Sequence, residues 1–180
     1  ALASFYQRDM AQALAQGRRA AAIFPNNVLR RSNVALYAMY AGQFEDAITE
    51  STEVHRLNPT HLKAFVARAL SLLALDRTPE ASATYDALAA TSPAGASFAA
   101  AGRADMAHYH GQFAEAATLL GAAITADLAR ENTTAAAAKR VALAEVRLAQ
   151  GDLTAAAREA DAAVATNDSD IIRFLSLIHI

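Results

Sequence analysis

The chain has 180 residues and a formal net charge of −2, from 16 Lys and Arg residues against 18 Asp and Glu residues. It lacks the basic excess that neutralises phosphates, which argues against a nucleic-acid ligand, and it has no Cys for disulfides or thiolate metal sites. Ala accounts for 49 residues, against 7 Gly and 4 Pro, so an all-α fold is predicted. No apolar run reaches the roughly 18 residues that span a bilayer, so a soluble protein without a membrane span is expected. The absence of Cys is compatible with a reducing compartment, and a cytoplasmic location is our expectation.

The pattern of apolar residues and turn signals predicts helices along the whole chain and no strand. The first is expected over residues 4–23, and another begins near Asp170, after the polar start at Asp168. Residues 175–180 contain neither Ala nor charge and resemble translated adapter sequence, so a non-native tail is our hypothesis. Between these ends we expect four helix pairs, at 28–41 with 44–57, 61–75 with 78–91, 95–110 with 113–130, and 134–150 with 153–166.

Each pair contains a short turn of one kind. Gly42, Gly111 and Gly151 each precede a polar residue and then a large apolar one, and Gly readily adopts the left-handed conformation that ends a helix. In the second pair Asp76-Arg77-Thr78-Pro79 fills this place. There we expect Thr78 to cap the next helix and Pro79 to occupy its first turn.

Small residues recur at fixed distances from these turns, where close helix crossing would require them. They lie seven residues before each turn, at Ala35, Ala69, Ala104 and Ala144, and five residues after it, at Ala47, Ala81, Ala116 and Ala156. Pro25, Pro59 and Pro93 mark the links between units and stand 34 residues apart. This spacing predicts a single helical-repeat array over residues 1–180. Its parts are a partial repeat at 1–25, repeats at 26–59, 60–93, 94–132 and 133–168, and a truncated helix at 169–180.

Between the last two repeats the period lengthens to 40, and residues 127–134 absorb the extra length. We expect additional helical turns there, followed by a helix start capped by Thr.

The repeat resembles the tetratricopeptide repeat, most clearly in the second copy. Phe65 stands in the Trp position of that pattern, Ala69 in the small position and Leu72 in the Tyr position, followed by Ala81, Tyr85 and Pro93. In other copies Arg31, Ala100 and Arg140 replace the first aromatic. The resemblance implies a right-handed α-solenoid of antiparallel helical hairpins, without catalytic activity or cofactor, that binds a protein or peptide partner or an adjacent domain.

In that family the first helix of each hairpin lines a concave groove. The resemblance places these residues in it: Leu29, Ser32, Leu36, Met39 and Tyr40; Lys63, Val66, Leu70 and Leu73; Phe98, Asp105, His108 and Tyr109; and Val141, Glu145 and Leu148. About half of such residues belong to the core instead, since apolar stripes at helical spacing usually do. Chaperone-binding members clamp a terminal carboxylate with Lys, Asn and Arg, and Ser32 and Leu36 stand where this clamp needs such groups, so we reject that ligand class.

Residues 27–42 also resemble repeat segments that follow the catalytic domain of some bacterial serine/threonine kinases. The alternative function is therefore a regulatory segment of a larger signalling protein, either a kinase or a transcription regulator. The sequence itself contains no Gly-rich loop, His-Arg-Asp or Asp-Phe-Gly motif. In His108-Tyr109-His110 the two His side chains point about 200° apart on a helix, so they do not predict a metal site.

Overall fold

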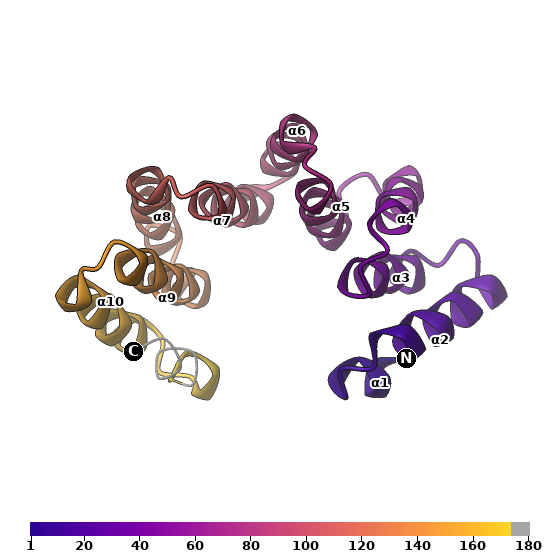
Figure 1. Ribbon diagram of the computed structural model, residues 1–180, viewed down its shortest axis with the longest axis horizontal. Helices are drawn as coiled ribbons and strands as arrows, with labels where there is room; N and C mark the ends of the chain where they lie inside the picture. Colours follow the sequence, from indigo (N-terminus) through magenta and orange to yellow (C-terminus); the bar gives the residue numbers. More distant parts are fainter. Residues whose placement is uncertain (174–180) are drawn as a thin grey trace. The chain divides into compact units, whose positions relative to one another are not determined.

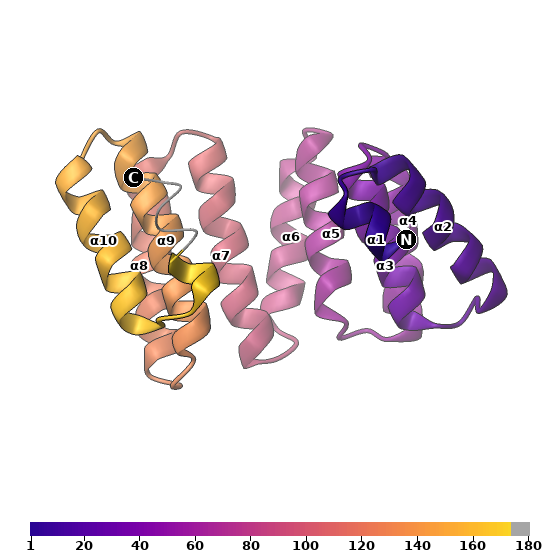
Figure 2. The same ribbon diagram turned by 90° about the horizontal axis from the view of Figure 1, so that it is seen from below.

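A computed structural model describes residues 1–173 of the chain. These residues form helices without strands and divide into two compact units, unit 1 over Ala1–Thr91 and unit 2 from Ser92 onward. The helices are, in unit 1, α1 (Leu2–Tyr6), α2 (Met10–Ile23), α3 (Val28–Tyr40), α4 (Phe44–Leu57), α5 (Leu62–Ala74) and α6 (Thr78–Ala89), and in unit 2, α7 (Pro93–Tyr109), α8 (Phe113–Leu128), α9 (Thr133–Ala149) and α10 (Leu153–Thr166). Within each unit, successive helices pack as antiparallel neighbours joined by short turns (Figure 1, Figure 2).

The predicted all-α class and helical hairpins are therefore confirmed. All four predicted pairs are present, as α3 with α4, α5 with α6, α7 with α8, and α9 with α10, and every boundary lies within two residues of its expected position. Within residues 1–173, no helix is both long and apolar enough to cross a membrane.

The first predicted helix is interrupted, which corrects the expectation of one helix over residues 4–23. The helix α1 ends at Tyr6, Arg8 adopts a left-handed φ of 61°, and α2 starts anew at Met10. The break is stabilised by Asp9, whose side chain accepts a hydrogen bond from the backbone N–H of Gln12 at 2.9 Å. This is a typical N-cap, and it competes successfully with helix continuation.

The turns inside the hairpins have the predicted backbone geometry. Gly42, Gly111 and Gly151 have φ values of 73°, 73° and 79°, and Asp76 takes the equivalent place with a φ of 58°. The prediction for Thr78 was wrong, because Thr78 is the first residue of α6 and Arg77 precedes it as the capping residue. Pro79 does lie in the first turn, where its missing N–H costs no helical hydrogen bond.

The Ala residues at fixed distances from these turns are the innermost residues of the hairpins. All eight are between 0% and 1% exposed, although they come from eight different helices. A methyl group at each crossing allows the two helix backbones to approach closely, so the prediction of a packing role is confirmed.

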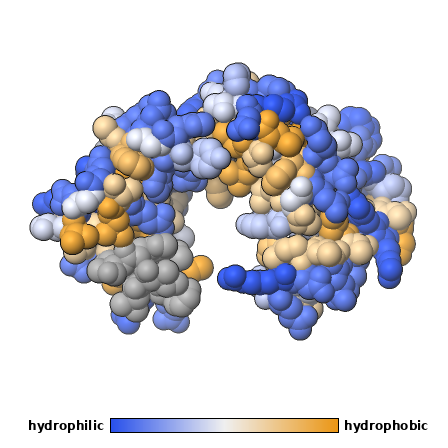
Figure 3. Space-filling view, in the orientation of Figure 1, coloured by the Kyte–Doolittle hydropathy of each residue, from blue (hydrophilic) through white to orange (hydrophobic). Residues whose placement is uncertain are grey.

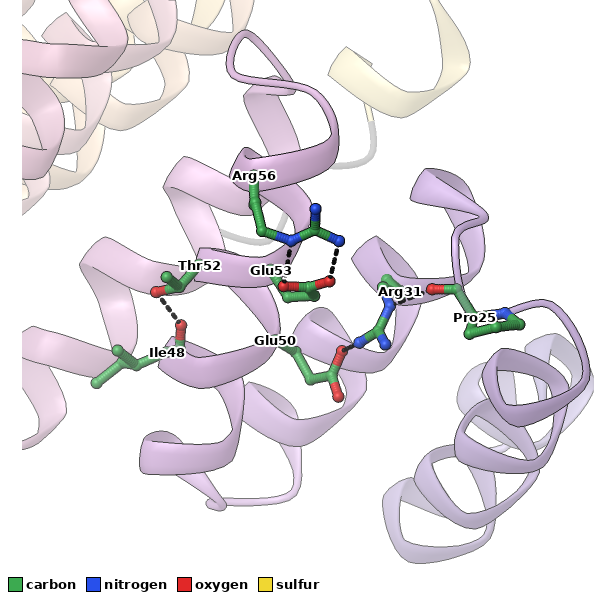
Figure 4. Close-up of polar contacts among 7 residues, drawn as sticks. All are labelled: Pro25, Arg31, Ile48, Glu50, Thr52, Glu53 and Arg56. Atoms are coloured by element: carbon green, nitrogen blue, oxygen red, sulfur yellow. Dashed lines mark hydrogen bonds and ion pairs between the residues drawn. The ribbon is translucent and has the colours of Figure 1, made fainter.

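Two Arg–Glu ion pairs hold hairpins together where the repeat lacks its usual aromatic residue. Arg31 of α3 contacts Glu50 of α4 at 2.8 Å and also donates to the carbonyl of Pro25 (Figure 4). Arg140 of α9 contacts Glu159 of α10 at 2.9 Å, with the same separation of 19 residues. All four side chains are partly buried, so a guanidinium fork takes over the cross-hairpin contact that a ring would make.

The longer link between the last two repeats lies in unit 2. Helix α8 extends to Leu128, a turn follows with Glu131 at a φ of 58°, and Asn132 caps α9 by accepting from the N–H of Ala135. The extra helical residues were predicted correctly, whereas the capping residue is Asn132 rather than Thr. A further helix begins at Asp170 as expected, and Ile172 is buried with Val141 and Ala163. The proposed non-native residues 175–180 lie outside the described part of the chain.

Candidate functional site

The candidate groove in unit 1 is formed by α3 and α5, the first helices of two hairpins. Leu29, Tyr40 and Lys63 are exposed there, the first two at 59% and 54%. Leu36 and Leu70 are only partly buried, and both pack against one core cluster, so α3 and α5 touch directly. Val66 and Leu73 are also partly buried, and Figure 3 shows apolar surface over α5.

Two residues predicted for this groove lie inside the unit instead. Met39 is 8% exposed and belongs to the core cluster around Val34 and Tyr37. Ser32 is 1% exposed, and its hydroxyl lies 2.8 Å from the ring nitrogen Nε2 of His61. Both residues are therefore buried in unit 1 rather than exposed in a groove.

The aromatic end of α3 is covered by the N-terminal helix. The ring of Phe5 lies 5.3 Å from the ring of Tyr37 and 5.3 Å from that of Tyr40. The predicted groove residue Tyr40 is therefore already in contact with an aromatic side chain of α1.

The two histidines that flank Pro59 make contacts within unit 1. The His55 ring stacks on Phe65 with 4.0 Å between centroids, and burial lowers the pKa of both His55 and His61. In the part of the chain that the structure describes, no group of three or more His, Asp or Glu side chains is arranged to hold a metal ion.

Unit 2 has a pocket of about 490 Å³ between its two first helices, α7 and α9. Five of its eleven lining residues are Ala, and Phe98 and Asp105 lie on the α7 side. Phe98 is 54% exposed, which leaves its ring available at the pocket. The full lining is Ala94, Ser97, Phe98, Ala101, Asp105, Asn132, Thr134, Ala135, Ala138, Lys139 and Ala142.

The other predicted residues of unit 2 surround this pocket or lie away from it. Glu145 and Leu148 are partly buried on α9, whereas Val141 is 4% exposed and belongs to the core. His108 packs edge-on against Phe113, with 5.5 Å between ring centroids, while Tyr109 is 73% exposed and contacts His110. Of the predicted residues, the structure therefore gathers Phe98 and Asp105 into one cavity.

The surroundings of Asp105 are unfavourable for the ionised form of its side chain. Burial against the pocket wall raises the pKa of the Asp105 carboxyl, although part of the residue is still exposed to solvent. The nearby Glu145 raises this pKa further, and His108 lowers it by a smaller amount. Each of the first two effects makes the ionised form of Asp105 less stable, the first through lost hydration and the second through like-charge repulsion.

Two residues that line the same pocket, Ser97 and Lys139, belong to a buried polar network that was not predicted. The Lys139 ammonium donates to Asp127 at 2.6 Å and to the Ser97 hydroxyl at 2.8 Å, and Ser97 in turn lies 3.0 Å from the same Asp127 oxygen. Exposed fractions are 5% for Lys139, 1% for Asp127 and 9% for Ser97. A buried charge is tolerated only when it is paired and hydrogen-bonded, and this network meets both conditions.

The network joins three helices of unit 2. Ser97 lies in α7, Asp127 near the end of α8 and Lys139 in α9. The network therefore positions the helices that form the pocket.

Comparisons with known proteins identify the architecture. No protein-family model and no curated protein sequence matches the chain. Among solved structures, TTC0263, a thermophilic TPR protein of Thermus thermophilus, is similar with a TM-score of 0.73 and 19% identity, over 99% of this chain and 94% of that one. The chain has a tetratricopeptide-like fold.

Two further structures agree with this tetratricopeptide-like fold. MamA from Desulfovibrio magneticus RS-1 gives a TM-score of 0.57 at 17% identity, over 94% of this chain and 92% of that chain. A tetratricopeptide repeat protein from Parabacteroides merdae ATCC 43184 gives 0.56 at 17% identity, over 98% and 80%. The resemblance drawn from the spacing of Ala, Gly and Pro is thus confirmed for the fold.

The unfavourable position of Asp105 has a measurable consequence for stability. Since the folded-state pKa of Asp105 is raised, wild-type protein loses stability as pH rises through that pKa. Asp105→Asn removes this loss, so we expect the variant to be more stable at pH 7, by less than about 1 kcal/mol because solvent screens the group. Urea unfolding at pH 7 and at pH 4 should show the advantage shrinking in acid. An equal or lower stability of the variant at pH 7 would contradict this electrostatic description of the pocket.

Proposed function

We propose that the chain is a non-catalytic protein-interaction module that holds a peptide segment or a neighbouring domain on the faces of its first helices. The observation that carries this proposal is the pocket between α7 and α9, in a fold shared with a solved TPR protein. Tetratricopeptide-like hairpins expose one face of each first helix, and in unit 2 that face is hollowed.

The chemistry of the pocket suits side chains of a peptide better than a small polar metabolite. A volume of about 490 Å³ lies within the usual range of ligand pockets, and the lining is dominated by methyl groups. Phe98 adds an exposed aromatic ring, a residue type enriched at binding interfaces. Asn132 and Thr134 supply polar groups at the α9 end of the pocket.

A direct test selects ligands without assuming their sequence. The full chain is used to enrich binders from a random 12-residue peptide library, and the affinities of the enriched peptides are measured by fluorescence anisotropy. Ala138→Trp places an indole in the pocket from an exposed position of α9, and we expect it to weaken binding at least 10-fold. Ala122→Trp on α8, also exposed but outside the pocket lining, is the matched control and should leave binding unchanged. Binders that Ala138→Trp and Ala122→Trp affect equally would contradict the proposed site.

Residues 27–42 resemble repeat segments of some bacterial serine/threonine kinases. This resemblance supports a more specific hypothesis, in which the module regulates an attached catalytic or DNA-binding domain. Reading the open reading frame upstream of Ala1 tests it. A kinase or DNA-binding domain there would support the hypothesis, and a nearby start codon would exclude an upstream domain.

A further inference from the structure

One position of the repeat changes its chemistry between the two units. The residue that follows the buried Ala of each first helix is Leu36 in α3 and Leu70 in α5, but Asp105 in α7 and Glu145 in α9. In unit 1 these Leu side chains pack against the core and help α3 and α5 to touch. In unit 2 the same position carries two carboxylates beside a pocket. The two units therefore present different surfaces to a partner.

The negative charge of Asp105 is not neutralised by the neighbouring cations. In the described part of the chain, no hydrogen bond or ion pair engages Asp105, which lies in the pocket wall and is repelled by Glu145 across the two helices. The basic groups of α9 are engaged elsewhere, Lys139 with Asp127, Arg140 with Glu159 and Arg147 with Gln150. His108 is the group that attracts the Asp105 carboxylate, with a weaker effect than the unfavourable ones.

The aromatic ring of Phe98 and the carboxylate of Asp105 belong to residues at different positions along the axis of α7. Phe98 and Asp105 are seven residues apart, which is about 10 Å at 1.5 Å per residue of helix. A peptide in the extended polyproline II conformation advances about 3.1 Å per residue with three residues per turn, so side chains three positions apart lie on one face, about 9 Å apart. The α7 face thus matches an apolar side chain and, three residues away, a basic one.

We propose that the pocket of unit 2 binds an extended peptide segment that places an apolar side chain between α7 and α9 beside Phe98 and a Lys or Arg side chain against Asp105. This proposal rests on the proposed function and specifies its partner, a basic and apolar segment. The Ala methyl groups accept the apolar side chain, and the Asp105 carboxylate in the pocket wall attracts the cation. Arg suits the site best, because its planar fork pairs with a carboxylate through two hydrogen bonds.

The test uses three labelled 12-residue peptides and the full chain, with fluorescence anisotropy at low salt. The first repeats Leu-Ser-Ser-Arg, the second replaces each Arg by Glu, and the third replaces each Leu by Ser. We expect the Leu/Arg peptide to bind at least 10-fold more tightly than either of the others. Asp105→Asn should weaken Leu/Arg binding about 5- to 10-fold, and Asp105→Arg should reverse the preference toward the Leu/Glu peptide.

The controls separate this inference from the proposed function. Glu115→Gln removes an exposed carboxylate of α8, away from the pocket, and should leave all three affinities unchanged. Equal binding of the Leu/Arg and Leu/Glu peptides, both weakened by Ala138→Trp, would overturn the inference and keep the interaction module. Absence of binding by all three peptides, while library-selected peptides still respond to Ala138→Trp, would also overturn the inference alone. Circular dichroism of the Asp105 variants confirms that each comparison is made between folded proteins.

Discussion

Lys139→Met should destabilise unit 2 by about 3–5 kcal/mol, the cost expected when one partner of a buried ion pair is removed. The substitution leaves the Asp127 carboxylate 1% exposed with the Ser97 hydroxyl as its remaining side-chain donor in the network. Asp127 also lies in the last turn of α8, where the helix dipole disfavours a negative charge. The measurement is urea unfolding followed by circular dichroism, with hydrogen exchange of α8 and α9 assigning the loss to unit 2.

The matched control is Lys63→Met, because Lys63 is the other lysine of the chain and its side chain is exposed on α5. We expect a change below about 0.5 kcal/mol there. The double variant Lys139→Met with Asp127→Leu should recover most of the lost stability, since an apolar pair of similar volume replaces an ion pair at little cost. A loss below about 1 kcal/mol for Lys139→Met alone would show that the buried charges are not coupled as described.

The position of Lys139 in the repeat indicates burial, whereas its residue type indicates exposure. Lys139 stands five residues before Ala144, and the equivalent positions in α5 and α7 are Ala64 and Ala99, both 0% exposed. In α3 the equivalent residue, Arg30, is exposed, so the repeat alignment places Lys139 at a position that is buried in two of the three other first helices. Lysine is normally exposed, and for that reason a sequence interpretation treats it as a surface residue. The partner Asp127 could not be identified in the same way, because the lengthened link moves it out of the regular spacing.

Local signals determined most of the fold, whereas the pocket depends on packing between repeats. Gly42, Gly111 and Gly151 indicate turns through their own backbone preference, and nearby residues are enough to identify them. The space between α7 and α9 instead depends on which side chains fill it. Where unit 1 has Leu36 and Leu70, unit 2 has Asp105 and Glu145, and five of the eleven residues that line the unit 2 pocket are Ala. The sequence identified Asp105 and Phe98 as groove residues but not the cavity that they share.

The second large effect on stability is expected at the buried Ala positions, because a small side chain there allows the two helices of a hairpin to pack closely. Ala81 of α6 is 0% exposed, whereas Ala83, two residues along the same helix, is exposed. Leu has nearly the helix propensity of Ala, so replacing either residue tests packing rather than helix formation. We expect Ala81→Leu to cost about 1–3 kcal/mol of unit 1 stability, because the added methylene groups force α5 and α6 apart.

Ala83→Leu should change the free energy of unfolding by less than about 0.5 kcal/mol, since its side chain extends into solvent. Urea unfolding of the two variants, with hydrogen exchange of α5 and α6, gives the comparison directly. Equal unfolding midpoints would mean that the hairpin tolerates a large residue at the crossing, and the regular Ala spacing would then lose its physical explanation. A selective loss for Ala81→Leu would instead show that this spacing, visible in the sequence at all four hairpins, sets the distance between helix backbones.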